Sequence, residues 1–165
     1  MSNELSVSRE PRTRKVDLRL LQRATKRALA LLDVDYVLGM RVVGSREMAR
    51  ANEAYLSHTG PTDVITFHYQ QATVRASAAD AKDKRHICGD ILICSDVAEK
   101  QAAEFRTSVA HELVRYSVHG VLHLLGFDDR TAAARAKMKK LENKLMRQLT
   151  REFNLGLSSA KAPHG

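Results

Sequence analysis

The spacing of apolar residues divides the chain into helical segments separated by shorter strand-like ones. Leu18, Leu21 and Leu29 recur on one face of a helix, and Asp17 before them suits the N-cap position. We therefore predict a helix over residues 18–32. The same criteria predict further helices over residues 45–56, 95–105, 108–125 and 130–153.

Three short segments rich in strand-forming residues lie between these helices. They cover residues 36–43, 63–69 and 91–94. A turn at Gly60-Pro61 precedes the second of them. The polar, alanine-rich stretch 71–85 shows no period and is expected to be a surface loop. Helices combined with a few strands indicate an α+β protein, with a small sheet on which the helices pack.

One domain accounts for most of the 165 residues, an ordinary length for a single hydrophobic core. Residues 1–16 carry several basic side chains and no period, so they are expected to form a loose N-terminal arm. The domain is expected over residues 17–153, followed by a flexible C-terminal tail over residues 154–165.

The chain is basic, with 27 Lys and Arg against 19 Asp and Glu and a formal net charge of +8. Such an excess attracts polyanions, which include nucleic acids and anionic membrane surfaces. Much of it falls between residues 130 and 152, and four of the basic side chains there recur at helical spacing. They are Lys137, Lys140, Lys144 and Arg147. The apolar stripe beside them is typical of a core helix rather than a membrane-surface helix, so a membrane-binding role is disfavoured. The basic stripe is then either a solvated helix face or an RNA-binding one.

The two cysteines, Cys88 and Cys94, lack the spacing of a zinc or redox pair and are too few for a disulfide scaffold. We expect no disulfide. Residues 1–16 contain no apolar core of a secretory signal, and no apolar run is long enough to span a bilayer. A cytoplasmic protein without a membrane partner is therefore expected.

Histidines cluster on the predicted helix over residues 108–125. His119 and His123 stand four residues apart, so both imidazoles lie on one helix face and can reach one metal ion. Gly126 suits the end of the helix, and Asp129 follows beyond the turn as a third ligand. This order predicts a metal site with three protein ligands and an open fourth position.

The alternative is that both histidines are merely exposed or hydrogen-bonded in place. His111 lies two turns earlier and is expected to have a structural or supporting role. Zinc peptidases of this pattern place a glutamate directly after the first histidine, and here that position is Gly120. Peptidase activity is therefore disfavoured, whereas hydrolysis assisted by an open-site metal remains the expected class.

These residues, with two further motifs, resemble the YbeY family of metal-dependent endoribonucleases. The motifs are His119-Gly-Val-Leu-His123-Leu-Leu-Gly-Phe-Asp128, Pro61-Thr-Asp-Val-Ile-Thr-Phe67 and Gly89-Asp-Ile-Leu-Ile93. The resemblance implies a small mixed β-sheet among about five helices, and one Zn²⁺ per chain. It also implies a role with the small ribosomal subunit in ribosomal RNA maturation and ribosome quality control.

The chain departs from the family pattern at two positions. Members usually end the metal motif with a third histidine where this chain has Asp129, and a carboxylate is an acceptable zinc ligand. Many members also carry an arginine at the position of Leu56, which is thought to face the substrate phosphate. His58 and Arg130 are the candidate catalytic residues that would replace it.

Two functions follow from these observations. One is a zinc-dependent endoribonuclease that cleaves single-stranded ribosomal RNA precursors, with the metal held by His119, His123 and Asp129. The other is a noncatalytic ribosome-assembly factor that binds RNA and whose metal is structural.

Overall fold

The hydrophobic pattern folds as four strands and five helices in the part of the chain that the computed structural model describes, residues 3–56, 62–69 and 85–156. The strands are β1 (Glu4–Arg9), β2 (Val34–Val43), β3 (Val64–His68) and β4 (Arg85–Cys94). The helices are α1 (Leu18–Leu32), α2 (Ser45–Leu56), α3 (Ser95–Phe105), α4 (Val109–Leu124) and α5 (Ala132–Phe153). The predicted α+β class, with a small sheet and about five helices, is confirmed.

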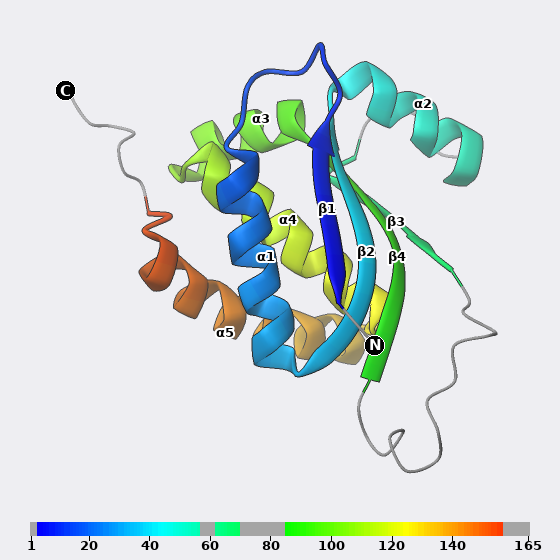
Figure 1. Ribbon diagram of the computed structural model, residues 1–165, viewed down its shortest axis with the longest axis vertical. Coiled ribbons are helices and arrows are strands. Elements are labelled where there is room, and N and C mark those ends of the chain that lie inside the picture. The colour runs from blue at the N-terminus through cyan, green and yellow to red at the C-terminus, as the bar shows by residue number, and fades with distance from the viewer. Residues whose placement is uncertain (1–2, 57–61, 70–84, 157–165) are drawn as a thin grey trace.

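The strands form one mixed sheet in the order β1-β2-β4-β3. β1 pairs parallel with β2 and β2 pairs parallel with β4, whereas β3 pairs antiparallel with β4 at the edge. One side of the sheet packs against α1 and α4, with α5 outside them, and α2 covers one end of the other side (Figure 1). The two central strands, β2 and β4, pair along their whole lengths, and alternate residues of each are buried because successive side chains point to opposite faces of the sheet.

The prediction of a loose N-terminal arm is wrong for residues 4–9. These residues form β1, in which Leu5 is buried and pairs with Leu38 of β2. Only Leu5 and Val7 carry the apolar alternation, and this segment is too short for its period to stand out. Its order comes from hydrogen bonding to β2, a long-range partner that local pattern does not reveal.

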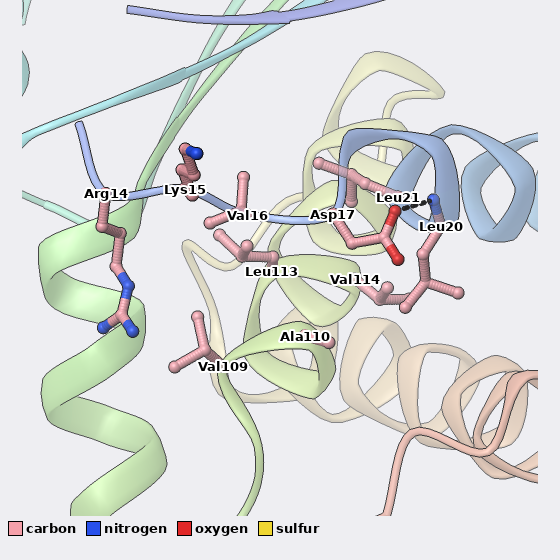
Figure 2. A pocket seen from close by; sticks show the side chains of 10 residues that line it. All are labelled: Arg14, Lys15, Val16, Asp17, Leu20, Leu21, Val109, Ala110, Leu113 and Val114. Atoms are coloured by element: carbon pink, nitrogen blue, oxygen red, sulfur yellow. Dashed lines mark hydrogen bonds between the residues drawn. The ribbon is translucent and has the colours of Figure 1, made fainter. Parts of the chain in front are cut away.

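The connector between β1 and α1 is also held in place (Figure 2). Arg14 pairs with Glu99 of α3 at 2.5 Å, and Asp17 caps α1 by accepting from the Leu20 N–H at 3.0 Å, as predicted. Beneath the connector lies a small cavity of about 150 Å³, between Val16 and the first turns of α4. The predicted arm is therefore part of the folded domain from β1 onward.

Most predicted elements are observed, with shifted ends. The bounds of α1 and α2 are those predicted, α5 begins at Ala132 rather than residue 130, and β4 begins at Arg85 rather than Ile91. The loop predicted over residues 71–85 therefore ends one residue early, and its other residues lie outside the described ranges.

At the C-terminus, Leu155 is buried and its carbonyl accepts from the Ser108 hydroxyl. The predicted flexible tail is thus wrong at its first residues, and residues 157–165 are outside the described part.

Two further expectations concern cysteines and membranes. Cys88 and Cys94 are both free thiols, so no disulfide forms between them. None of the helices in the described ranges is long and apolar enough to cross a bilayer.

α4 is the central helix of the domain. Val118, Val121 and Leu122 are fully buried. A Cβ on Gly120 would lie 3.0 Å from Ile91 Cγ2 in β4, so glycine allows α4 to approach the sheet closely. This packing fixes the position of the two histidines that flank Gly120.

Gly89 of β4 provides a test of how tightly the sheet is packed. A Cβ at this position would lie 2.3 Å from the Phe67 carbonyl oxygen of β3. We expect Gly89→Ala to lower the free energy of unfolding by about 1–3 kcal/mol, because the backbone of β3 must shift. Urea denaturation measures the change. Gly156→Ala is the matched control, since a Cβ at that position would have nothing within 4 Å, and an equal loss in both variants would contradict the explanation.

Candidate metal centre

Two histidines converge at the C-terminal end of α4. Ser108 caps this helix by accepting from the His111 N–H at 2.9 Å. His119 and His123 lie one turn apart and half-buried, with their rings in an edge-to-face arrangement and their centroids 4.6 Å apart. Their Nε2 atoms are 3.1 Å apart.

The chain then reverses at Gly126 and brings a carboxylate to the same place. Gly126 has φ +104°, a backbone conformation that favours glycine, as predicted for the end of the helix. Asp129 follows, exposed, and the ligand atoms of His119, His123 and Asp129 all lie within 4.8 Å of one another. The three residues that the sequence singles out as ligands are therefore brought together.

Hydrogen bonds fix the tautomer of both rings. His119 Nδ1 lies 2.8 Å from Oε1 of Glu142 on α5, and His123 Nδ1 lies 3.1 Å from the Phe127 carbonyl oxygen. An ionised carboxylate and a carbonyl accept hydrogen bonds but cannot donate them, so each Nδ1 carries a proton and donates it. In the neutral rings, the lone pairs are then on the two Nε2 atoms.

The position of these lone pairs matches a metal ion. Two nitrogens bound to tetrahedral zinc at about 2.0–2.1 Å are roughly 3.3 Å apart, close to the separation of the two Nε2 atoms. Unprotonated nitrogens this close repel one another unless a cation lies between them. With the negative charge of Asp129 alongside, the donor set fits a divalent metal ion.

Burial favours the metal-binding form of His123. Desolvation lowers the pKa of this imidazole below its ordinary value, and the neighbouring His119 lowers it further. The ring is therefore neutral at neutral pH, which is the state that binds metal.

Glu142 is a buried carboxylate that supports the site from the adjacent helix. Its side chain is 3% exposed. Burial opposes its ionisation, but the hydrogen bond from His119 and the charges of Lys139 and Arg115 outweigh burial, and its pKa lies below the ordinary value. A charged carboxylate that accepts from a ligand histidine orients the ring and makes Nε2 a better donor to metal.

A cleft of about 570 Å³ opens beside His119 and Asp129. Three cationic side chains line it: Arg115, Arg135 and Lys139. Arg135 Nη1 donates to the Asp129 carbonyl oxygen at 3.0 Å, which places a guanidinium next to the third candidate ligand. Positive groups around a metal centre suit an anionic substrate such as a phosphodiester.

The other predicted site residues lie elsewhere. Arg130 is exposed and does not line the cleft, and His58 lies outside the described residues. His111 contacts Glu112 at 3.3 Å rather than the metal centre. The four residues of the basic stripe are exposed on α5: Lys137, Lys140, Lys144 and Arg147.

Sequence reasoning misses Glu142, Arg115 and Arg135. In the sequence Glu142 is simply an acidic residue in a basic helix, although its position carries a signal. It stands four residues after Met138 and three before Leu145, on the apolar stripe that packs into the core. A carboxylate on a buried stripe requires a partner, and His119 of α4 supplies it.

Comparison with known proteins finds a matching family model, "Endoribonuclease YbeY", over residues 6–150. A protein of Corynebacterium jeikeium named endoribonuclease YbeY is 36% identical over 142 residues, which are 84% of this chain and 78% of that protein. One of Chlorobium luteolum with the same name is 37% identical over 108 residues, 66% of this chain and 70% of the relative.

The fold also has a solved counterpart. The solution structure of a protein from Thermotoga maritima matches with a TM-score of 0.66 and 20% sequence identity, over 98% of this chain and 99% of that one. At this identity, the likeness supports the fold alone.

The role of Glu142 is testable with a nearly isosteric variant. We expect Glu142→Gln to lower zinc affinity about 10–100-fold, because an amide can still accept from His119 Nδ1 but no longer carries the charge that strengthens Nε2. Competition with a chelating dye measures the affinity, and circular dichroism checks the fold.

Glu112→Gln is the matched control for this variant. Glu112 is also buried and contacts Arg115, at 3.6 Å, but its hydrogen bonds are to Thr107 and His111. We expect its substitution to leave zinc affinity within about twofold of the unmodified protein. Equal losses in both variants would show that any buried charge in this region affects the metal indirectly.

Proposed function

The chain belongs to the YbeY family of endoribonucleases, as its motifs predict, and we propose that it is a metal-dependent nuclease that cleaves single-stranded segments of ribosomal RNA precursors. The observation that carries this proposal is the convergence of His119 and His123, with Nε2 atoms 3.1 Å apart and both Nδ1 atoms committed to acceptors. Asp129 completes the donor set.

One zinc ion per chain is the proposed cofactor. Two imidazole nitrogens and one carboxylate form a common donor set for catalytic zinc, with a further position left for water or substrate. When bound, such a metal supplies Lewis-acid polarisation of a phosphoryl oxygen and lowers the pKa of water.

The protein's own residues orient and bind. Glu142 holds the His119 ring and the Phe127 carbonyl holds the His123 ring, so both keep one tautomer. Arg135 and Lys139 line the cleft beside them and are positioned to bind phosphate oxygens of the substrate. We propose that these two cations supply what the family arginine supplies elsewhere, where this chain has Leu56.

Arg130 and His58 remain weaker candidates for the same role. Arg130 is not among the residues that line the cleft, and its backbone N–H donates to Asp128 at 3.0 Å. Its exposed side chain is available to a longer RNA substrate.

The basic stripe on α5 is proposed as the surface that follows the RNA backbone. Lys137, Lys140, Lys144 and Arg147 are exposed, while Met138, Leu145 and Leu149 of the same helix are buried. The helix begins shortly after Asp129, so the stripe starts near the metal centre and extends away from it. We further propose that the substrate is ribosomal RNA and that the protein associates with the small ribosomal subunit. The proposal also includes a part in ribosome quality control and a cytoplasmic location.

Cleavage of a structured ribosomal RNA fragment by purified protein tests the activity. We expect cleavage with zinc or another divalent metal, loss of cleavage with a chelator, and at least about a hundredfold loss in His119→Ala. His111→Ala removes a histidine of the same helix that does not face the metal centre, and it is expected to retain activity. If the protein binds RNA but does not cleave it with any metal, the alternative function, a noncatalytic assembly factor, is favoured instead. The presence of Leu56 where many family members carry an arginine also favours this alternative.

Charge reversal tests the basic stripe. We expect the combined change Lys140→Glu, Lys144→Glu and Arg147→Glu to weaken RNA binding and to reduce the slope of log affinity against log salt by about 2, since each lost phosphate contact removes roughly 0.7 for single strands. Reversal of Arg19, Lys26 and Lys100, which are exposed on α1 and α3, makes the same change in net charge. A similar loss in this control would mean that net charge, rather than the stripe, attracts the RNA.

A further inference from the structure

A second groove, of about 760 Å³, lies on the side of the sheet that α1 and α4 do not cover. We call this surface the open sheet face. α2 packs over one end of it, against Val43, Ile65 and Cys94. The remainder is lined by side chains of all four strands and one helix, and it is separate from the cleft beside the metal centre.

Exposed aromatic rings mark this groove. Tyr55 of α2 is 68% exposed and Tyr69, directly after β3, is 49% exposed. Phe67 lies between sheet and helix, with its ring edge-to-face to Tyr55 at 5.2 Å. Large aromatic side chains are normally well buried, so rings held in place with their faces in solvent indicate a binding surface.

The floor of the groove is formed by the strands and carries both polar and apolar side chains. The strand register places Ser6, Gly39, Asp90 and Phe67 side by side across the four strands. A Cβ on Gly39 would lie 2.5 Å from Asp90 Oδ1, so the Asp90 carboxylate occupies the space that a side chain at position 39 would take. Asp90 Oδ2 accepts from the Tyr69 hydroxyl at 2.6 Å, which holds that ring beside the carboxylate.

Two guanidinium groups lie at the rim. Arg50 of α2 pairs with Glu47 at 3.5 Å, but both side chains are exposed, so the pair is weak and can be exchanged for a phosphate. Arg41 of β2 is exposed and reaches the Ser8 hydroxyl at 3.5 Å. Neither arginine is buried or held by a strong partner within the described ranges.

This combination matches the chemistry of single-stranded RNA. Aromatic faces stack on bases of any sequence, guanidinium groups bind the phosphates between them, and hydroxyl or carboxylate oxygens accept from base amino groups and ribose hydroxyls. The two guanidinium groups at the rim favour an occupant that carries phosphates. The charge of the chain, +8, also favours a polyanion.

β3 separates the open sheet face from the side of the sheet on which α4 carries the metal centre. β3, which is five residues long, is the edge strand of the sheet. Its Thr66 packs at the Gly120 position beside His119, whereas the next residue, Phe67, lines the groove. An RNA strand that passes around this short edge strand therefore leaves one surface and enters the other.

We propose that the open sheet face binds a short single-stranded segment of the RNA substrate, with bases stacked on Tyr55 and Tyr69 and phosphates bound by Arg41 and Arg50. The segment flanks the one presented to the metal centre, so the inference rests on the proposed nuclease function for its substrate. It assigns RNA binding to a face of the domain other than α5.

Binding of a labelled single-stranded RNA, followed by fluorescence anisotropy with chelator present, tests the proposal without cleavage. We expect Tyr55→Ala and Tyr69→Ala each to weaken binding roughly fivefold to a hundredfold, and Tyr55→Phe to retain it, because stacking needs the ring and not the hydroxyl. Arg41→Ala is expected to lower the affinity several-fold and to reduce its salt dependence, whereas Arg19→Ala, an exposed arginine on α1, is not.

Affinities of both tyrosine variants within twofold of the unmodified protein would overturn the proposal. A changed oligomeric state in light scattering with unchanged RNA affinity would assign the face to protein contacts and would overturn it as well. Cleavage is measured separately. If the unmodified protein does not cleave RNA but Tyr55→Ala still weakens RNA binding, the nuclease function is refuted and the binding face is supported. If the unmodified protein cleaves RNA but the tyrosine variants bind it with unchanged affinity, the nuclease function is supported and the binding face is refuted.

Discussion

The hydrogen bond from His119 to the buried carboxylate of Glu142 is the interaction on which the rest of the site depends. A carboxylate that is 3% exposed must be paired, and its partners here are one imidazole, one arginine and one lysine. The bond ties α4 to α5, sets the tautomer of His119, and brings the cationic side chains of α5 to the wall of the cleft. The same contact thus serves both the geometry of the metal centre and the attachment of α5 to α4, beside the buried apolar residues of α5.

The sequence predicts the helices well because each one has an apolar stripe and three of them, α1, α4 and α5, begin at a side-chain cap. Asp17 and Ser108 mark the starts of α1 and α4, and the four-residue spacing of His119 and His123 places them on one face. Spacing also identifies Asp129 beyond the glycine turn. What local pattern cannot supply is pairing between distant segments. β1 has only two apolar residues and is ordered by β2, and Glu142 is recognisable as internal only once α5 is known to pack on α4.

The domain presents different chemistry on the two sides of its sheet. The side packed against α4 leads to ligand atoms and cations around a cleft, and the other side offers exposed aromatic rings along a groove. Phe105 is a further exposed aromatic residue, and it lines the cleft rather than the groove. The exposed rings in the described part of the chain therefore gather at the two hollows and not over the outer faces of the helices, a distribution that folding alone does not require.

The position of Glu142 within α5 has a consequence for biosynthesis. α5 is the last helix of the domain, Ala132–Phe153, and it follows both histidines and Asp129 in the chain. A nascent polypeptide that has emerged only as far as Asp129 already carries all three metal-binding side chains, yet nothing holds the His119 ring. Competence to bind metal tightly is therefore acquired late in translation, after nearly the whole domain has been made.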